Sequence, residues 1–182
     1  MKKILAALFM LLSVQTFSQV AQYRAINGIL IINATKDGQA YRYTNKNILV
    51  NMNYQDGSFL LKLNNTDFYQ SDSATNANIQ DTITQEQYVF SGILPLNQIL
   101  DQQTNEQNYD IELQLTNENL NLYQTLNLTM TITVPNASGQ KNYRIFVING
   151  ILQNDELQLP AFSGFDNDIE MWIQFSGIAT SN

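Results

Sequence analysis

The chain has 182 residues and a formal net charge of −7, and it contains neither histidine nor cysteine. Without cysteine it has no disulfide, thiolate nucleophile or Fe–S cluster. Without histidine it lacks the commonest general base and transition-metal ligand, and a Ser–His–Asp triad is impossible. The length favours one domain. Asparagine and glutamine supply 23 and 19 residues, while only 14% of the chain is charged.

Residues 1–18 have the composition of a secretory signal peptide. Lys2 and Lys3 form a short basic region, residues 4–14 are mostly apolar, and Thr16 and Ser18 place small side chains before a cleavage site after Ser18. An uncleaved membrane anchor is the alternative, but the apolar run of about 11 residues is shorter than the roughly 20 that span a bilayer. Because no cysteine follows the run, a lipoprotein anchor is excluded.

Cleavage after Ser18 predicts a periplasmic or secreted domain over residues 19–182, with no integral membrane segment. Removal of Lys2 and Lys3 changes the net charge from −7 to −9. The remaining basic residues are scattered, so neither nucleic acid nor an anionic lipid surface is an expected partner.

Alternation of apolar and polar residues with a period of two dominates the rest of the chain, as is typical of half-buried strands. Between residues 126 and 134, apolar residues take every second position, and Asn or Thr fills the positions between them. About nine strands are predicted in this way, over residues 26–34, 39–44, 48–54, 59–63, 88–94, 109–115, 126–134, 143–149 and 169–175.

Short turn sequences between these strands predict antiparallel pairing. Asp37-Gly38 and Asp56-Gly57 suit tight hairpin turns, residues 136–139 form another turn, and Asn149-Gly150 is expected to bend or bulge its strand. Residues 70–87 are predicted to form a polar loop. It contains Ser73 and Thr82 as candidate O-glycan acceptors, and the sequence leaves open whether either is glycosylated. The sequence thus predicts a single antiparallel β domain, a barrel of about eight or nine strands or, alternatively, a β-sandwich.

One short helical segment is predicted over residues 95–100. It begins with Pro95, and Leu96, Ile99 and Leu100 follow with helical spacing.

Two groups of carboxylates invite a chemical interpretation. Asp166, Asp168 and Glu170 alternate as oxygen ligands of calcium can, but the glycine and the distal glutamate of an EF-hand loop are missing. Asp155-Glu156 supplies the residue types of a glycoside hydrolase, without the spacing or cleft that such an enzyme needs. We expect turn and solvent-facing positions for both groups, and therefore no metal, no cofactor and no catalytic residue.

The order of the elements resembles that of the YceI-like family. The residues that carry the resemblance are the hairpin start at residues 26–48, Asp67-Phe68 at a strand end, the Tyr88-x-Phe90-x-Gly92 strand after a loop, and a closing strand after acidic turn residues. The resemblance covers most of residues 26–175. It implies a secreted, lipocalin-like antiparallel barrel that binds a long polyisoprenoid lipid.

A lipid of this kind implies an apolar lumen, because alternation directs one set of residues of each strand inward. The same residues would form a filled core if no ligand enters. The candidate ligand-binding residues are Val50, Met52, Phe59, Leu61, Phe90, Leu128, Met130, Ile145, Met171 and Ile173.

The leading hypothesis is therefore a non-enzymatic binding protein for a hydrophobic, isoprenoid-like small molecule. A secreted β-sandwich with a structural or adhesive role is the alternative, and a carboxylate-dependent hydrolase is the third. A continuous apolar cavity of roughly several hundred cubic ångströms distinguishes the first from the second, since a lipid binder predicts such a cavity and a sandwich predicts none. The sequence leaves the oligomeric state open.

Overall fold

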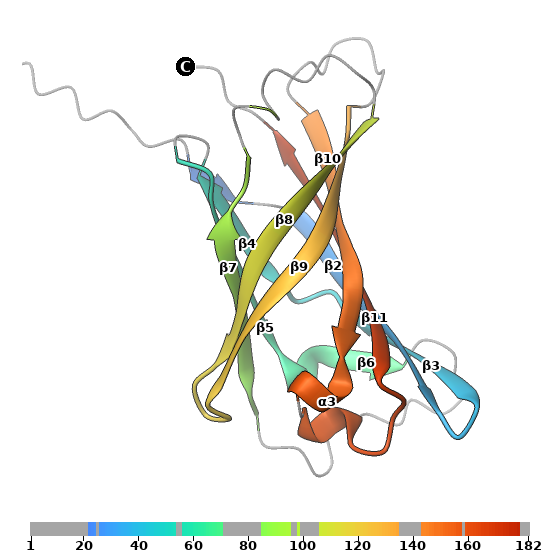
Figure 1. The fold of residues 1–182 in the computed structure, drawn as a ribbon. Coiled ribbons are helices and arrows are strands. Elements are labelled where there is room, and N and C mark those ends of the chain that lie inside the picture. The colour runs from blue at the N-terminus through green and yellow to red at the C-terminus, as the bar shows by residue number, and fades with distance from the viewer. Residues whose placement is uncertain are drawn as a thin grey trace, which may run out of the picture.

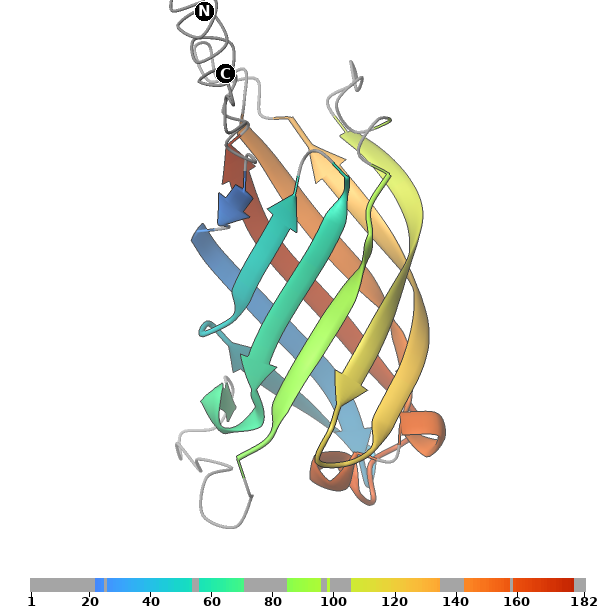
Figure 2. The ribbon, with the colours of Figure 1, turned by 90° about the vertical axis from the view of Figure 1, so that its left-hand side faces the viewer.

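The computed structural model describes residues 22–24, 26–53, 56–70, 85–95, 98, 106–134, 143–157 and 159–178. In this part of the chain, eleven strands form one antiparallel sheet in the order β1-β4-β5-β7-β8-β9-β10-β11-β2-β3-β6. The sheet curls into a barrel of tilted strands (Figures 1 and 2). The strands are β1 (Gln22–Arg24), β2 (Ile26–Lys36), β3 (Gln39–Asn45), β4 (Leu49–Asn53), β5 (Ser58–Asn64), β6 (Phe68–Gln70), β7 (Gln87–Ile93), β8 (Glu106–Asn117), β9 (Leu122–Thr133), β10 (Tyr143–Gln153) and β11 (Asp168–Ile178).

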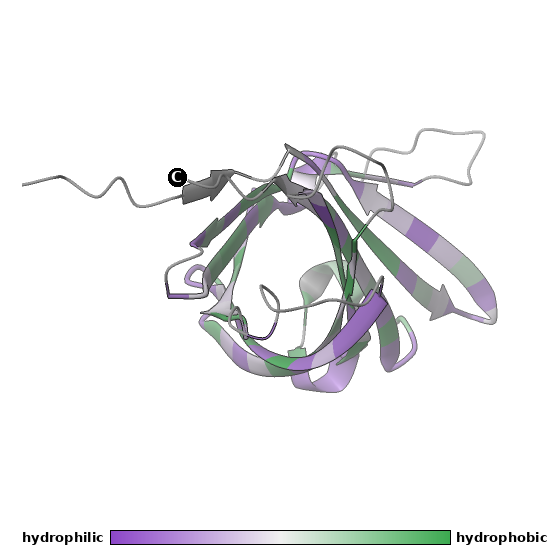
Figure 3. Ribbon diagram, turned by 90° about the horizontal axis from the view of Figure 1, so that it is seen from above, coloured by the Kyte–Doolittle hydropathy of each residue, from purple (hydrophilic) through white to green (hydrophobic). Residues whose placement is uncertain are grey.

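The N-terminal strands complete the ring that is seen along the barrel axis in Figure 3. β1 pairs with β4, where Gln22 lies opposite Asn53, and β2 pairs with β11, where Trp172 lies opposite Ile31. Because β1 leads almost directly into β2, one short stretch of chain joins β1, at one edge of the sheet, to β2, which lies two strands from the other edge. β3 and β6 continue the sheet beyond β2.

The predicted antiparallel barrel is confirmed, and all nine predicted strands are present. The alternative sandwich is wrong, because the described strands belong to a single sheet. The β2–β3 turn has the predicted form, since Asp37 and Gly38 adopt positive φ angles of 52° and 74°. β1 and β6 were not predicted, because three residues are too few for an alternation to be recognised.

The barrel interior is filled by the inward set of each strand. Along β8 and β9, buried and exposed residues alternate, and Leu113, Met130 and Ile132 are completely buried. Phe146 of β10 and Phe175 of β11 stack with ring centroids 4.9 Å apart. Burial of this apolar surface is the main contribution to the stability of the fold.

In the described part of the chain, three helical turns of three or four residues each lie between strands. They are η1 (Asn65–Asp67), α3 (Asn154–Leu157) and η3 (Pro160–Phe162). Asp155 and Glu156 therefore belong to a helical turn, not to the expected hairpin turn. The predicted helix over residues 95–100 lies mostly outside the described residues, as do the signal peptide, Ser73 and Thr82.

Of the expected bend or bulge at Asn149-Gly150, no bulge is present in the pairing with β11, while the pairing of β10 with β9 ends at Asn149, opposite Thr129. β10 keeps an unshifted register with β11 through Gly150, which lies opposite Met171. Gly150 instead makes room for packing, because a Cβ atom there would lie 2.4 Å from Cδ2 of Leu128.

Candidate functional site

An apolar pocket lies at the end of the barrel that carries η3 and β6. Figure 1 shows this end at the bottom, where β6 and α3 are labelled. The volume of the pocket is about 70 Å³, which is smaller than the cavity of several hundred cubic ångströms that the sequence-based hypothesis predicts. The lining side chains come from the inner faces of strands on all sides of the barrel and from η1, η3 and the approach to η3. They are Leu30, Ile32, Tyr43, Leu63, Asn65, Phe68, Tyr88, Phe90, Leu115, Leu152, Leu159, Ala161, Phe162 and Met171.

The pocket wall is almost wholly hydrocarbon because the inward positions of the strands carry Leu, Ile, Met and Phe. None of the lining residues is charged, and their polar atoms come chiefly from Tyr43, Asn65 and Tyr88. Asn65 is tied into the wall, since its Oδ1 accepts a 2.9 Å hydrogen bond from the backbone N–H of Glu86. A wall of this composition favours an apolar ligand and fixes its orientation with few polar contacts.

The η3 segment covers one side of the pocket through an aromatic cluster. The rings of Tyr43 and Phe162 meet edge to face with centroids 6.0 Å apart, and Phe165 packs against both. Asn154 holds this segment in place, because its Nδ2 donates to the carbonyl oxygens of Phe162 and Phe165 at 2.9 and 3.3 Å. The pocket wall therefore depends on contacts at the α3 end of β10.

Two tyrosines at the pocket have perturbed acidity. Burial raises the pKa of Tyr43, and nearby Tyr41 raises it further. Burial also raises the pKa of Tyr88, with a further rise from Glu86 and a smaller opposing effect of the Asn117 side chain. Both phenols therefore stay protonated at neutral pH and can donate a hydrogen bond.

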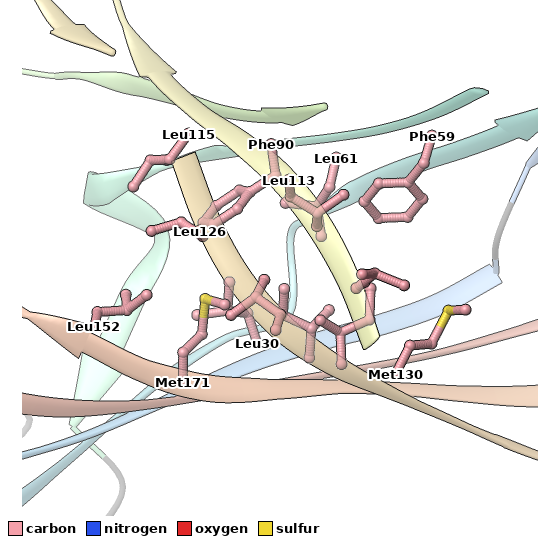
Figure 4. Packing of buried hydrophobic residues seen from close by; sticks show 14 of the residues in the cluster. Leu30, Phe59, Leu61, Phe90, Leu113, Leu115, Leu126, Met130, Leu152 and Met171 are labelled. Atoms are coloured by element: carbon pink, nitrogen blue, oxygen red, sulfur yellow. The ribbon is translucent and has the colours of Figure 1, made fainter. Parts of the chain in front are cut away.

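Nine of the ten predicted ligand-binding residues are buried on the inner face of the barrel. Phe90 and Met171 line the pocket. The other seven lie in the core, and Figure 4 shows Phe59 and Met130 farther along the interior than Leu115 and Leu152. These seven are Val50, Met52, Phe59, Leu61, Leu128, Met130 and Ile173. Contact of any of the nine with a ligand stays a prediction.

Ile145 is the exception and does not face the interior. It is partly exposed, whereas its neighbour Phe146 is fully buried. The sequence around Ile145 is apolar on both sides of the strand, so that alternation could not decide which residues point inward. The buried side of β10 consists of Phe146, Ile148 and Leu152.

Several pocket residues were missed by sequence reasoning. Leu30 and Leu115 belong to predicted strands and could have been found from the same alternation. Leu159, Ala161 and Phe162 lie in an irregular segment, whose path across the end of the barrel has no periodic pattern.

The candidate carboxylates take part in surface hydrogen bonds. Oδ1 of Asp168 accepts from Gln153 Nε2, and Oε2 of Glu170 accepts from Asn33 Nδ2. Oε2 of Glu156 accepts from Gln124 Nε2, and the backbone N–H of Asp155 donates to Oδ1 of Asn167. In the described part of the chain, no three acidic side chains are grouped as a metal site would require.

No helix among the described residues is long and apolar enough to cross a bilayer.

The comparisons with known proteins identify a fold. No protein-family model matches the chain, and no curated protein matches its sequence. Among solved structures, the chain is similar to a polyisoprenoid binding domain from Saccharophagus degradans implicated in plant cell wall breakdown. The TM-score is 0.68 at 7% sequence identity, and the match covers 87% of this chain and 98% of the other. The resemblance to YceI-like barrels is thereby confirmed in the fold.

Proposed function

We propose that the protein binds a hydrophobic small molecule of the polyisoprenoid type inside its barrel, as a non-enzymatic binding protein. The observation that carries this proposal is the uncharged pocket between the inner face of the sheet and η3. Each methylene group that a ligand transfers from water into such a wall contributes about 0.8 kcal/mol. Affinity thus grows with chain length and requires no catalytic group.

The similar solved structure supports the same ligand class, since it is described as a polyisoprenoid binding domain. The low sequence identity of 7% means that the pocket residues must be tested in this chain itself.

The dimensions of the pocket constrain how such a ligand binds. About 70 Å³ accommodates a short part of an isoprenoid chain, whereas pockets for drug-sized ligands measure roughly 300–1,000 Å³. We propose that the rest of the isoprenoid chain enters the barrel interior beyond the pocket, where flexible side chains change rotamer and make room for it. Met171 at the pocket and Met130 farther along the interior are suited to this, because methionine has three rotatable bonds and adapts to irregular spaces.

The proposed place of action is the periplasm or the exterior of a bacterial cell. This part of the proposal rests on Lys2, Lys3, the apolar run after them and the small residues before position 19. Intact-mass measurement of the exported protein tests it. The mass of a chain that begins at Gln19 supports export with cleavage, whereas a full-length chain retained in the cytoplasm contradicts it.

Native mass spectrometry of the protein purified from its own cell envelope tests the binding function. We expect a complex heavier than the polypeptide, with a lipid that organic solvent extracts and that fragments as an isoprenoid. A bare polypeptide mass together with an empty extract would contradict the proposal. The same protein purified from the cytoplasm, after deletion of residues 1–18, serves as the control for lipids acquired during purification.

A further inference from the structure

A buried amide lies beside the pocket without a complete set of partners. Asn117, at the end of β8, is only 1% exposed, and its Oδ1 accepts a 3.2 Å hydrogen bond from the backbone N–H of Leu120. Its Nδ2 has no hydrogen-bond partner within the part of the chain that the structure describes. A buried donor in this state is costly, so native proteins rarely keep one without a reason.

The position of Asn117 connects it to the pocket. It lies on the inner side of β8, two residues after the pocket residue Leu115. On the neighbouring strand β7, Val89 pairs with Thr116, which brings Tyr88 next to Asn117. Tyr88 lines the pocket, and the Asn117 amide is near enough to its phenol to lower the pKa, against the larger effect of burial. Tyr88 belongs to the pocket lining and Asn117 is its neighbour just outside that lining, so that a ligand oxygen that reaches the phenol lies next to the amide as well.

The charge nearby limits what this position can receive. Glu86 raises the pKa of Tyr88, so its carboxylate makes the surroundings of the phenol electronegative. Glu86 is held by Asn119, whose Nδ2 donates to Oε2 at 2.9 Å. An anionic group such as a phosphate or carboxylate would be repelled here, whereas a neutral oxygen can accept from both donors.

We propose, resting on the proposed function, that Asn117 Nδ2 and the Tyr88 hydroxyl together donate to an uncharged acceptor oxygen of the ligand. The ligand is then a hydrocarbon chain with a neutral ether, ester, carbonyl or hydroxyl oxygen near one end. The apolar wall binds the chain, and the two donors determine which end enters this position.

Three probes with the same isoprenoid chain test the assignment. Farnesyl methyl ether has an acceptor oxygen, farnesene has none, and farnesyl phosphate is anionic. We expect the unmodified protein to bind the ether about tenfold more tightly than farnesene, as one net hydrogen bond would give. Farnesyl phosphate should bind more weakly than the ether.

The variants Tyr88→Phe and Asn117→Leu each remove one donor. We expect both variants to reduce the preference for the ether, which is the farnesene Kd divided by the ether Kd, from about tenfold to about threefold or less. Tyr123→Phe and Asn127→Leu are matched controls on the exposed outer face of β9, and they should leave the ratio unchanged. The ratio within each variant is the decisive quantity, because a loss of packing or of the Leu120 contact weakens both probes equally.

Two results would overturn the inference while the proposed function stands. One is equal affinity of the unmodified protein for the ether and farnesene, which would mean that something other than the ligand, such as a buried water, meets the Asn117 donor. The other is an equal weakening of both probes in the variants, which would make Asn117 and Tyr88 structural. If the unmodified protein binds none of the probes, the proposed function fails together with the inference.

Discussion

The side chain of Leu128 in β9 packs directly against Gly150 in the neighbouring strand β10. A Cβ atom at Gly150 would lie 2.4 Å from Cδ2 of Leu128, so that the leucine packs where the glycine has no side chain. The interior is close-packed at this point, and a volume change in one residue must be absorbed by the other.

This contact predicts a strong coupling between the two positions. Gly150→Ala should lower the free energy of unfolding by about 1–3 kcal/mol, since it forces Leu128 from its position. In a Leu128→Ala background, the same substitution should cost less than about 0.5 kcal/mol. Urea denaturation of the four proteins measures the coupling. Additive effects would show that Leu128 does not need the space at Gly150.

Adjacent residues of β10 should differ sharply in their contribution to stability. Phe146→Ala removes a fully buried ring that stacks on Phe175 and should cost about 3–5 kcal/mol. Ile145→Ala, on the partly exposed side of the same strand, should cost about 1 kcal/mol or less. Thermal or urea unfolding distinguishes them, and similar losses would mean that the inward side of β10 is wrongly assigned.

Asn154 should control the local stability of the pocket wall. Asn154→Ala removes the hydrogen bonds to the carbonyls of Phe162 and Phe165 and should cost about 1–2 kcal/mol. Hydrogen exchange should accelerate at the Phe162 and Phe165 amides more than in β8 and β9. Asp155→Ala, at an exposed side chain of the same helical turn, is the control. Unchanged exchange in η3 would show that Asn154 is not what holds it.

Stability should fall at alkaline pH. Burial raises the pKa of Tyr43, Tyr88 and Tyr109 above the ordinary value of 10.0. Below that value the phenols are protonated in both states, and above it the unfolded chain loses the protons first, so that unfolding becomes easier as the pH rises. Because the chain has no histidine, we expect little change between about pH 6 and 9.

Urea midpoints between pH 7 and 11.5 test this dependence. Tyr88→Phe should make the alkaline decline shallower, whereas Tyr123→Phe, at an exposed tyrosine, should leave it unchanged. An equally steep decline in Tyr88→Phe would show that its phenol does not contribute.

The extent to which the sequence predicts this structure depends on the regularity of each element. β8 and β9 alternate through their central parts, so their buried side follows from the residue pattern, but both strands begin several residues before the predicted ranges. In β10, apolar residues occupy both sides, and the choice of Ile145 as an inward residue was wrong. β1 and β6 are held by pairing with distant strands, which a local pattern does not record.

The candidate site is less predictable than the strands. Phe90 and Met171 could be identified as inward residues, but the pocket depends on where the barrel ends and on what covers it. Phe162 reaches the pocket because Asn154, eight residues earlier, binds its carbonyl oxygen. The role of Asn117 was also hidden, because asparagine is abundant throughout the chain and its residue type does not show which copies are buried, as Asn45, Asn65 and Asn117 are.

Photo-crosslinking locates a bound isoprenoid most directly. A farnesyl methyl ether analogue with a diazirine on its chain would be irradiated with the intact protein, and the labelled residues mapped by mass spectrometry. Binding inside the barrel predicts labels on inward residues at the pocket, such as Leu30, Phe90, Leu115 and Met171, and their loss when excess unlabelled ether competes. Labels confined to outer-face residues such as Ile151 and Trp172, or labels that competition leaves unchanged, would contradict binding inside the barrel.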